Sequence, residues 1–250
     1  MTDPRIHERR VDVARERGRR RRRRLVLALG AASLATGGLL IVHTGLFGAR
    51  TVRVLGSRHT PRSTILAAAH LQGSPPLIDV SPAIVSRRLE RLPWVAAAAV
   101  TISWPSTVTI RVTERVPVAA VALAGKGGPV ALCDGSGHVL EDLAARPPSL
   151  PLVRTSAPVG RPGSTLGRRG AELTAVAAGL PESMVAETSA IYADAGGTRL
   201  VLDDGIVAEV GVATQLRQKF VSLATVLAHG GLEGVRVVDL RDPEAPVLLR

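Results

Sequence analysis

The sequence predicts an α+β protein in which one membrane-spanning helix is followed by two mixed domains. Residues 25–47, LVLALGAASLATGGLLIVHTGLF, include no charged side chain and follow six consecutive arginines. Residues 50–118 show strand and helix patterns in the order strand, helix, helix, strand, strand. Residues 119–250 show mostly short strand patterns, with one strong helical pattern late in the chain. These three observations define the expected fold class.

The apolar stretch is long enough to cross a bilayer as a helix. At about 1.5 Å per residue, its length matches the roughly 30 Å of the hydrocarbon core. The alternatives are a cleaved signal peptide, a twin-arginine export signal and a buried core helix. A signal peptide has an apolar run of only about 7 to 15 residues, the arginines form one continuous block, and a core helix would need a large soluble fold around it. We therefore expect a transmembrane helix over 25–47.

The charges that flank this stretch predict its orientation. Eleven arginines and four acidic residues precede Leu25, so most of the net charge of +11 lies in residues 1–24. Arginines crowded at one end of a span mark its cytoplasmic side. We expect an Arg-rich cytoplasmic tail at 1–24 and residues 48–250 outside the cytoplasm, in a single-pass protein of the plasma (inner) membrane. Because topology explains the excess charge and no basic stripe with aromatics follows, nucleic acid is not an expected partner.

Composition restricts how the part outside the membrane can fold. About 200 residues follow the span, which is enough for one large or two small domains. Their core must be aliphatic, because the whole chain has only two Trp, two Phe and one Tyr. The single cysteine, Cys133, excludes an intrachain disulfide.

The first domain, residues 50–118, begins with a strand and two helices. Alternating residues over 51–55 indicate the strand. Each helix is expected to begin at a proline, Pro61 or Pro82, that follows a Thr or Ser suited to cap it. Apolar residues of the second helix recur at helical spacing, and they are Val85, Leu89 and Leu92.

A hairpin is expected to complete the first domain. Residues 95–103 and 107–114 have β-compatible sequences, and the Trp-Pro-Ser turn at 104–106 separates them. The second strand alternates strictly, with apolar residues on one face at Val108, Ile110 and Val112. One side of the hairpin should therefore be buried.

The second domain, residues 119–250, is expected to be mostly β. The predicted strands are at 117–124, 130–133, 138–140, 198–202, 206–210, 234–241 and 247–249. Residues 146–169, rich in Pro, Gly and Arg, are expected to form a long irregular connection, and 171–179 a short helix. A second helix is predicted over 216–227, because Leu216, Phe220, Leu223 and Leu227 recur at helical spacing.

Short motifs along the chain resemble one known family. In order they are the helix end LPWV at 92–95, the Trp-Pro turn at 104–105 and the strand end ERVPVA at 114–119. Their order and spacing resemble the POTRA domain of the bacterial division protein family FtsQ, also called DivIB. The hairpin around Gly205, the late helix and Asp239-Leu240-Arg241 are similar to the second, β-rich domain of that family. The resemblance implies a POTRA domain over 50–118 and an FtsQ-type β domain over 119–250.

A search of the sequence for catalytic chemistry finds no site. The six histidines lack the spacings that place two imidazoles together for a metal. Asp134, Ser136 and His138 bring an acid, a hydroxyl and an imidazole close in sequence, but the run DGSG is typical of a turn. Residues 203–205, Asp-Asp-Gly, likewise lie where a hairpin needs its turn. We therefore expect no enzyme activity, cofactor, metal site or small-molecule substrate.

The resemblance implies a non-catalytic scaffold of the division septum. A terminal strand commonly lies at a sheet edge, where unpaired backbone groups can accept a strand from another protein. In the family that the chain resembles, the last strands and the preceding helix receive the single-span proteins FtsB (DivIC) and FtsL, and through them act on FtsW and FtsI. Carried over to this chain, the partner-binding residues are Lys219, Phe220, Arg241, Val247, Leu248 and Leu249.

Alternatives remain for both the residues and the function. Phe220 and the aliphatic residues 247–249 are equally compatible with an ordinary core. A POTRA-bearing component of envelope transport or assembly is a second functional hypothesis, although such proteins usually carry several POTRA units or a barrel. An exported enzyme anchored by its N-terminus is a third, and it would require a convergent polar site.

Overall fold

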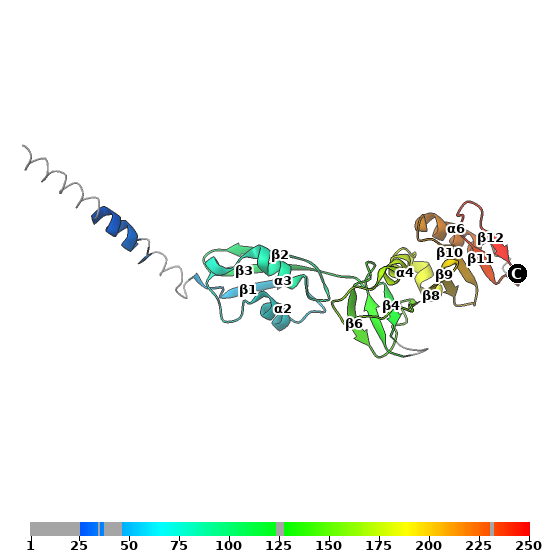
Figure 1. Ribbon diagram of the computed structural model, residues 1–250, viewed down its shortest axis with the longest axis horizontal. Helices are drawn as coiled ribbons and strands as arrows, with labels where there is room; N and C mark the ends of the chain where they lie inside the picture. The colour runs from blue at the N-terminus through cyan, green and yellow to red at the C-terminus, as the bar shows by residue number, and fades with distance from the viewer. Residues whose placement is uncertain (1–25, 35, 38–46, 124–127, 231–232) are drawn as a thin grey trace, which may run out of the picture.

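The computed structural model describes residues 26–34, 36–37, 47–123, 128–230 and 233–250. The predicted tail, 1–24, lies outside these residues, and so does much of the predicted span, 25–47. Residues 26–34 and 36–37 are helical. Among the helices in the described ranges, none combines the length and the apolar character needed to cross a membrane. Two folded units follow, arranged end to end in an elongated molecule (Figure 1).

The first unit has the predicted element order. Its strands are β1 (Thr51–Leu55), β2 (Val95–Ser103) and β3 (Thr107–Glu114), and its helices are α2 (Arg62–Ala69) and α3 (Pro82–Leu89), with a 3-10 turn, η2 (Leu77–Asp79), between the helices. The sheet order is β1-β3-β2. β1 runs parallel to β3, and β2 and β3 form the predicted antiparallel hairpin.

One face of this small sheet packs against the two helices. The alternating residues Val108, Ile110 and Val112 are all buried, as their spacing predicts. They share a core with residues of α2 and α3, which include Ile65, Val85 and Leu89. The predicted helix starts are also confirmed to within a residue, since α2 follows Pro61 directly and α3 begins at Pro82. Neither helix start has a side-chain capping hydrogen bond, so the prolines and the periodicity account for the agreement, and the predicted caps do not.

The second unit is one continuous nine-stranded sheet in the order β12-β11-β10-β9-β8-β7-β4-β5-β6. Its strands are β4 (Ala119–Ala122), β5 (Val130–Cys133), β6 (Val139–Leu143), β7 (Leu152–Arg154), β8 (Thr188–Asp194), β9 (Gly197–Leu202), β10 (Val207–Gly211), β11 (Val237–Asp239) and β12 (Val247–Leu249). Its helices are α4 (Arg168–Ala178), α5 (Glu182–Glu187) and α6 (Leu216–His229). The hairpin predicted around Gly205 is confirmed as β9–β10.

The prediction of an irregular connection over 146–169 was wrong in part. β7 lies inside that segment and pairs in parallel with both β4 and β8, so it joins the two halves of the sheet. Helix α5 and strand β8 were not predicted at all. A three-residue strand carries too little periodicity to be recognised, and parallel pairing depends on partners far away in the sequence.

Helices α4 and α6 cover one face of the nine-stranded sheet. A row of paired residues, Ile191, Leu200, Ala208 and Val238, is fully buried on that face. It forms one core with side chains of both helices, among them Leu173, Val176, Phe220 and Leu223. By strand alternation, residues one position along each strand point to the opposite face. That face has no helix among the described elements of the second unit.

The two units meet at a junction formed by His59, Trp94, Glu114, Arg115 and Asp134. Trp94 is buried and packs against residues of the second unit, which include Ala120, Val130, Leu132 and Leu140. The His59 ring stacks on Trp94 with centroids 4.0 Å apart and pairs with Glu114 at 2.9 Å. Arg115 Nη1 reaches Asp134 Oδ2 at 2.7 Å. Trp94, just before β2, and Arg115, just after β3, therefore connect the units through an apolar and a charged contact.

The residues 134–138 form the expected turn and not a triad. Ser136 Oγ donates to Asp134 Oδ1 at 2.7 Å, and the backbone N–H groups of Ser136 and His138 donate to the same oxygen at 2.9 Å each. Because the hydroxyl donates to the carboxylate and not to the imidazole, the geometry does not activate Ser136 as a nucleophile. Burial alone would raise the pKa of Asp134, but the hydrogen bonds from Ser136, His138 and Arg115 outweigh it and lower that pKa.

Candidate functional site

The last strand of the chain, β12, is an edge strand with exposed aliphatic side chains. Val247, Leu248 and Leu249 are 51%, 44% and 49% exposed. Within the described parts of the chain, β12 pairs with β11 alone. Its other side therefore offers backbone groups to solvent, and an apolar edge of this kind is a template for pairing with another chain.

The hydrogen-bond pattern shows which backbone groups of this edge face outward. Val207 donates to the Arg236 carbonyl just before β11, and Leu240, just after it, donates to the Glu209 carbonyl, so Val238 between them faces β10 by alternation. The Arg236 N–H donates to the Leu249 carbonyl at 2.9 Å, so Leu249 faces β11. By alternation, Val237 and Asp239 face β12, and their register partners Leu249 and Val247 face back toward them. The N–H and C=O of Leu248 are then the groups that point away from the sheet.

Phe220 and its helix support the edge from beneath. The Phe220 side chain is only 1% exposed and lies in the main core of the unit. From the same helix, Ser222 Oγ donates to the carbonyl of Pro243, in the loop that connects β11 to β12. The structure therefore places Phe220 in the core, which was one of the two interpretations left open by its sequence.

Lys219 is also buried, at 2% exposure, and it has backbone partners. Its Nζ donates to the carbonyl oxygens of Val210 and Val212, at 2.7 and 3.0 Å. Burial lowers the pKa of Lys219, and the nearby Asp239 carboxylate opposes that change. Lys219 thus joins the first turns of α6 to the end of β10.

Arg241 lies on the surface beside the edge and is held by Asp239. Arg241 Nε donates to Asp239 Oδ1 and Oδ2 at 3.0 and 2.9 Å, and these hydrogen bonds lower the pKa of Asp239. The pairing of Asp239 with Arg241 was not predicted from the sequence. Arg241 lies beyond the end of β11, and its backbone N–H also donates to Asp239 Oδ1 at 2.9 Å, so a local turn brings the two side chains together.

Asp239 is part of a charged row on the face of the sheet that the helices leave open. In register across the strands, the row runs Tyr192, Arg199, Glu209, Asp239 and Val247. Arg199 pairs with Glu209 at 2.7 Å and with Asp194 at 3.0 Å. The next row, Val201, Val207, Val237 and Leu249, is apolar and half-buried or exposed. A strand added beside β12 would extend both rows.

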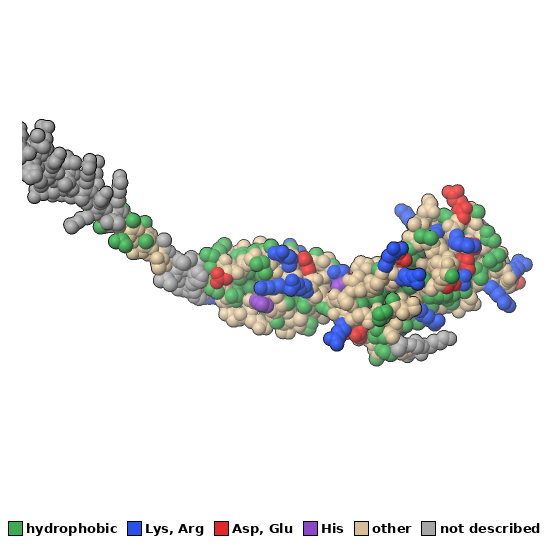
Figure 2. All heavy atoms as spheres, in the orientation of Figure 1, with side chains coloured by type: hydrophobic (Ala, Val, Ile, Leu, Met, Phe, Trp, Pro, Cys, Tyr) green, Lys and Arg blue, Asp and Glu red, His purple; other side chains and the backbone are tan. Residues whose placement is uncertain are grey.

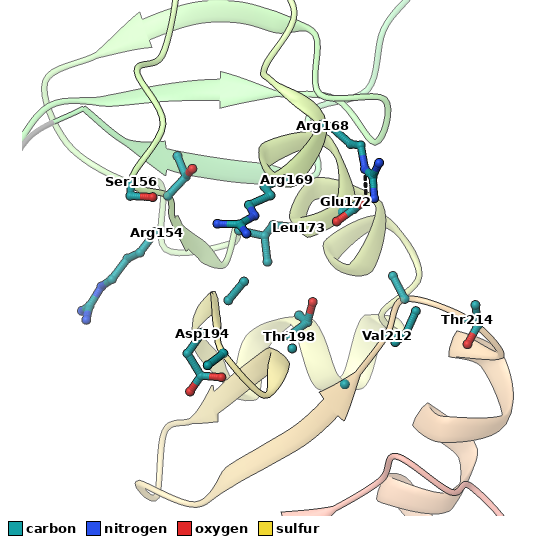
Figure 3. Close-up of a pocket in the computed structure, with 16 residues that line it drawn as sticks. Arg154, Ser156, Arg168, Arg169, Glu172, Leu173, Asp194, Thr198, Val212 and Thr214 are labelled. Carbon is teal, nitrogen blue, oxygen red and sulfur yellow. Dashed lines mark hydrogen bonds and ion pairs between the residues drawn. The ribbon is translucent and has the colours of Figure 1, made fainter.

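A cleft in the second unit offers a different kind of surface. Its volume is about 820 Å³, and it is lined by the start of α4, the segment after β7 and the loops at the ends of β8 and β10. Figure 3 shows Arg169 beside Leu173 over the cleft, Arg154 extending away from it, and Arg168 paired with Glu172. On the face shown in Figure 2, arginines are interspersed with acidic side chains over the second unit. The cleft is lined by a mixture of charged, hydroxyl and apolar side chains. The edge at β12 is the stronger candidate, because its aliphatic side chains are exposed and, among the described strands, it pairs on one side only.

Two family models match the chain and between them cover both units. A model described as "POTRA domain, FtsQ-type" matches residues 47–115. A model described as "Cell division protein FtsQ/DivIB, C-terminal" matches residues 122–241. The second match includes Lys219, Phe220 and Arg241 and ends before β12.

Three proteins described as cell division protein FtsQ are similar to this chain over much of its length. A cell division protein FtsQ from Mycolicibacterium smegmatis is 31% identical over 212 residues, which are 84% of this chain and 60% of the relative. One from Rhodothermus marinus is 31% identical over 61% of this chain and 56% of the relative. One from Streptomyces bingchenggensis is 35% identical over 71% of this chain and 68% of the relative. The chain thus spans somewhat more than half the length of the first two.

Proposed function

This chain belongs to the FtsQ/DivIB family of cell division proteins, and on that premise we propose that it is a non-catalytic scaffold of the division machinery. In this proposal its terminal edge binds single-span partners of the FtsB (DivIC) and FtsL type. Through them it would act on the septal peptidoglycan synthase FtsW and the transpeptidase FtsI. The observation that carries the proposal is the open, apolar edge at β12.

The edge favours strand addition over other modes of binding. Its exposed side chains are aliphatic, and Leu248 presents an N–H donor and a C=O acceptor to an incoming strand. Backbone hydrogen bonds supply affinity in this mode, while side chains of alternate residues supply specificity. Leu249 would contact the partner on the face opposite to the helices, and Leu248 would contact it on the helix side.

The other three predicted residues have supporting or peripheral places around the edge. Phe220 and Lys219 are buried, so they hold α6 and β10 in place beneath the terminal strands without touching a partner. Arg241 is exposed, with 61% of its side chain accessible, and is oriented by Asp239. It is therefore placed to contact a partner at the rim, where a charge affects the rate and specificity of association more than its strength.

Attachment to the membrane would strengthen these contacts. The proposed arrangement has residues 1–24 in the cytoplasm, one span over 25–47 in the plasma membrane, and both units outside, concentrated at the septum. Partners confined to the same bilayer meet at a high effective concentration, so contacts that are weak in solution become sufficient together.

Replacing Leu248 with proline tests strand addition while leaving the pairing of β12 with β11 in place. Leu248→Pro deletes the outward N–H, and proline is tolerated where the N–H of an edge strand faces solvent. The control is Leu248→Ala, which shortens the same side chain but keeps the N–H. We expect the intact chain and the alanine variant to capture FtsB- and FtsL-type proteins from solubilised membranes, and the proline variant to lose them while keeping its circular dichroism spectrum.

Each other outcome has a definite meaning. Equal capture by the proline variant would leave the scaffold role standing and exclude the edge as its site. Absence of both partners from the intact chain's complexes, together with normal septation after its depletion, would reject the scaffold role itself.

A further inference from the structure

The end of the first unit nearest the predicted span carries an exposed aromatic side chain. Trp104 lies in the turn between β2 and β3 and is 55% exposed. Its ring centroid is 6.0 Å from that of Phe47, with the ring planes tilted by 60°. This separation lies within the range of favourable aromatic pairs. The chain's other tryptophan, Trp94, is buried at the junction.

Backbone contacts fix this turn beside the segment that leads out of the predicted span. Thr51 N–H donates to the Ser106 carbonyl at 3.1 Å, next to Trp104 in the turn. Ala49 N–H donates to the Pro75 carbonyl at 2.8 Å, which brings the loop before η2 to the same end. Ile78 of η2 is 49% exposed. Apolar side chains from the turn and from the segment at Phe47 are therefore gathered at one end of the unit, and η2 lies close by.

The position of Phe47 at the end of the predicted span determines how close this end of the first unit lies to the bilayer. Phe47 is the last residue of the predicted span, so its ring lies at the boundary of the hydrocarbon core. On each side of that core, the headgroup region is about 5 to 8 Å deep. A ring 6.0 Å from Phe47 lies within that layer or at its surface. Tryptophan is enriched there, because it combines an apolar ring with an N–H that can bond to headgroups or water.

We propose that Trp104, Phe47 and Ile78 form a lipid-contact surface on the outer side of the membrane. The surface holds the first unit directly against the headgroups instead of leaving it on a free tether. This inference rests on the proposed membrane span. Its consequence is orientation, because the long axis of the molecule then leads from the bilayer toward the second unit and the edge at β12 (Figure 1).

The two tryptophans make the contact directly measurable. The full chain is reconstituted into phosphatidylcholine vesicles whose lipids carry bromine near the headgroup end of the acyl chains. Bromine quenches tryptophan emission only at short range, so it reports contact with lipid. We expect brominated vesicles to lower the emission of the intact chain relative to matched vesicles without bromine.

Two single substitutions assign the quenching to a residue. Trp104→Phe should abolish it, because the remaining Trp94 is buried away from lipid. Trp94→Phe should retain the quenching in full, because Trp104 is then the only tryptophan that emits. The emission of this variant in vesicles should lie at shorter wavelength than its emission when unfolded in urea without detergent. If Trp94→Phe does not fold, the difference between the intact chain and Trp104→Phe still measures the same quantity.

The outcomes separate this inference from the proposed function. A chain that floats with vesicles but whose quenching is unchanged by Trp104→Phe, or absent, overturns the lipid contact alone. A chain that does not float with vesicles overturns the membrane anchor and the lipid contact together. If Trp104 becomes protected from aqueous iodide only when other division proteins are added, the surface binds a protein, and the assignment to lipid is wrong.

Discussion

The junction and the terminal edge use the same kinds of residue in opposite ways. At the junction, Asp134 accepts hydrogen bonds from a side chain of the first unit and from its own turn, and Trp94 is buried between the units. At the edge, β12 pairs on one side only among the described strands, and three of its aliphatic side chains are exposed. Arg115 and Arg241 each pair with an aspartate, but Arg115 is 22% exposed and Arg241 is 61% exposed.

This difference indicates which contacts the chain completes by itself. Buried polar groups are costly unless they are paired, so the pairing of the Asp134 carboxylate at the junction favours one arrangement of the two units. Arg115 Nε and His138 Nε2 are buried there without a hydrogen-bond partner among the described residues. An exposed apolar edge carries a different cost, which is a risk of aggregation, because it can pair with a strand of any other chain. The proposed binding of a partner strand gives a reason to keep it open.

The two tryptophans should differ most in their effect on stability. Trp94→Ala removes a large side chain from a packed site and should lower the free energy of unfolding by about 3 to 5 kcal/mol. Trp104→Ala removes an exposed side chain and should cost less than about 1 kcal/mol. Urea denaturation of the full chain in detergent, followed by circular dichroism, measures both. Similar losses for the two variants would show that Trp94 does not hold the units together.

The two Arg–Asp pairs provide the next comparison. Asp134→Ala leaves Arg115 and two backbone N–H groups without their acceptor in a largely buried site, so we expect a loss of about 3 kcal/mol. Asp239→Ala frees a mostly exposed Arg241, and its cost should be less than about 1 kcal/mol. The same denaturation assay serves for both, and a larger loss for Asp239→Ala would reverse the contrast.

The sequence predicted the first unit better than the second for a physical reason. α2, α3 and the β2–β3 hairpin follow local signals, which are prolines at the helix starts and alternation over several residues. β7 consists of three residues that pair with strands on both sides, and nothing local marks it. Similarly, Arg115 and Asp134 are 19 residues apart, and no local pattern predicts that they pair. The edge position of β12 was expected from its place at the end of the chain, whereas the direction of Leu248 required the register.

Acid should weaken the junction through its carboxylates. His59 and three backbone N–H groups donate to Glu114, and these bonds outweigh burial and lower its pKa. A carboxyl group whose pKa is lowered on folding stabilises the fold above its unfolded pKa, and this contribution is lost as pH falls through the folded pKa. We therefore expect the free energy of unfolding to decrease below about pH 5.

Glu114→Gln isolates this contribution. The variant should be less stable than the parent at pH 7 and should show a shallower decrease between pH 5 and pH 3, because glutamine does not titrate. Asp239→Asn provides the comparison at the edge, where we expect a smaller change in the same range. An unchanged pH profile for Glu114→Gln would mean that Glu114 is not linked to folding.

The smallest expected effect is the absence of a reaction at Cys133. Burial, reinforced by Asp134 and Asp142, raises the pKa of this thiol to about 12. At pH 7 only about one molecule in 100,000 then carries the thiolate that reacts with alkylating agents. We expect Cys133 to resist iodoacetamide in the native full chain and to react in guanidinium. A second chain, with Cys133→Ala and Val247→Cys, should react in its native state, because position 247 is half exposed. If Cys133 in the native parent is alkylated as fast as the cysteine at 247, the sheet opens at β5. If a bound partner protects the cysteine at 247 from alkylation, that partner lies at the edge.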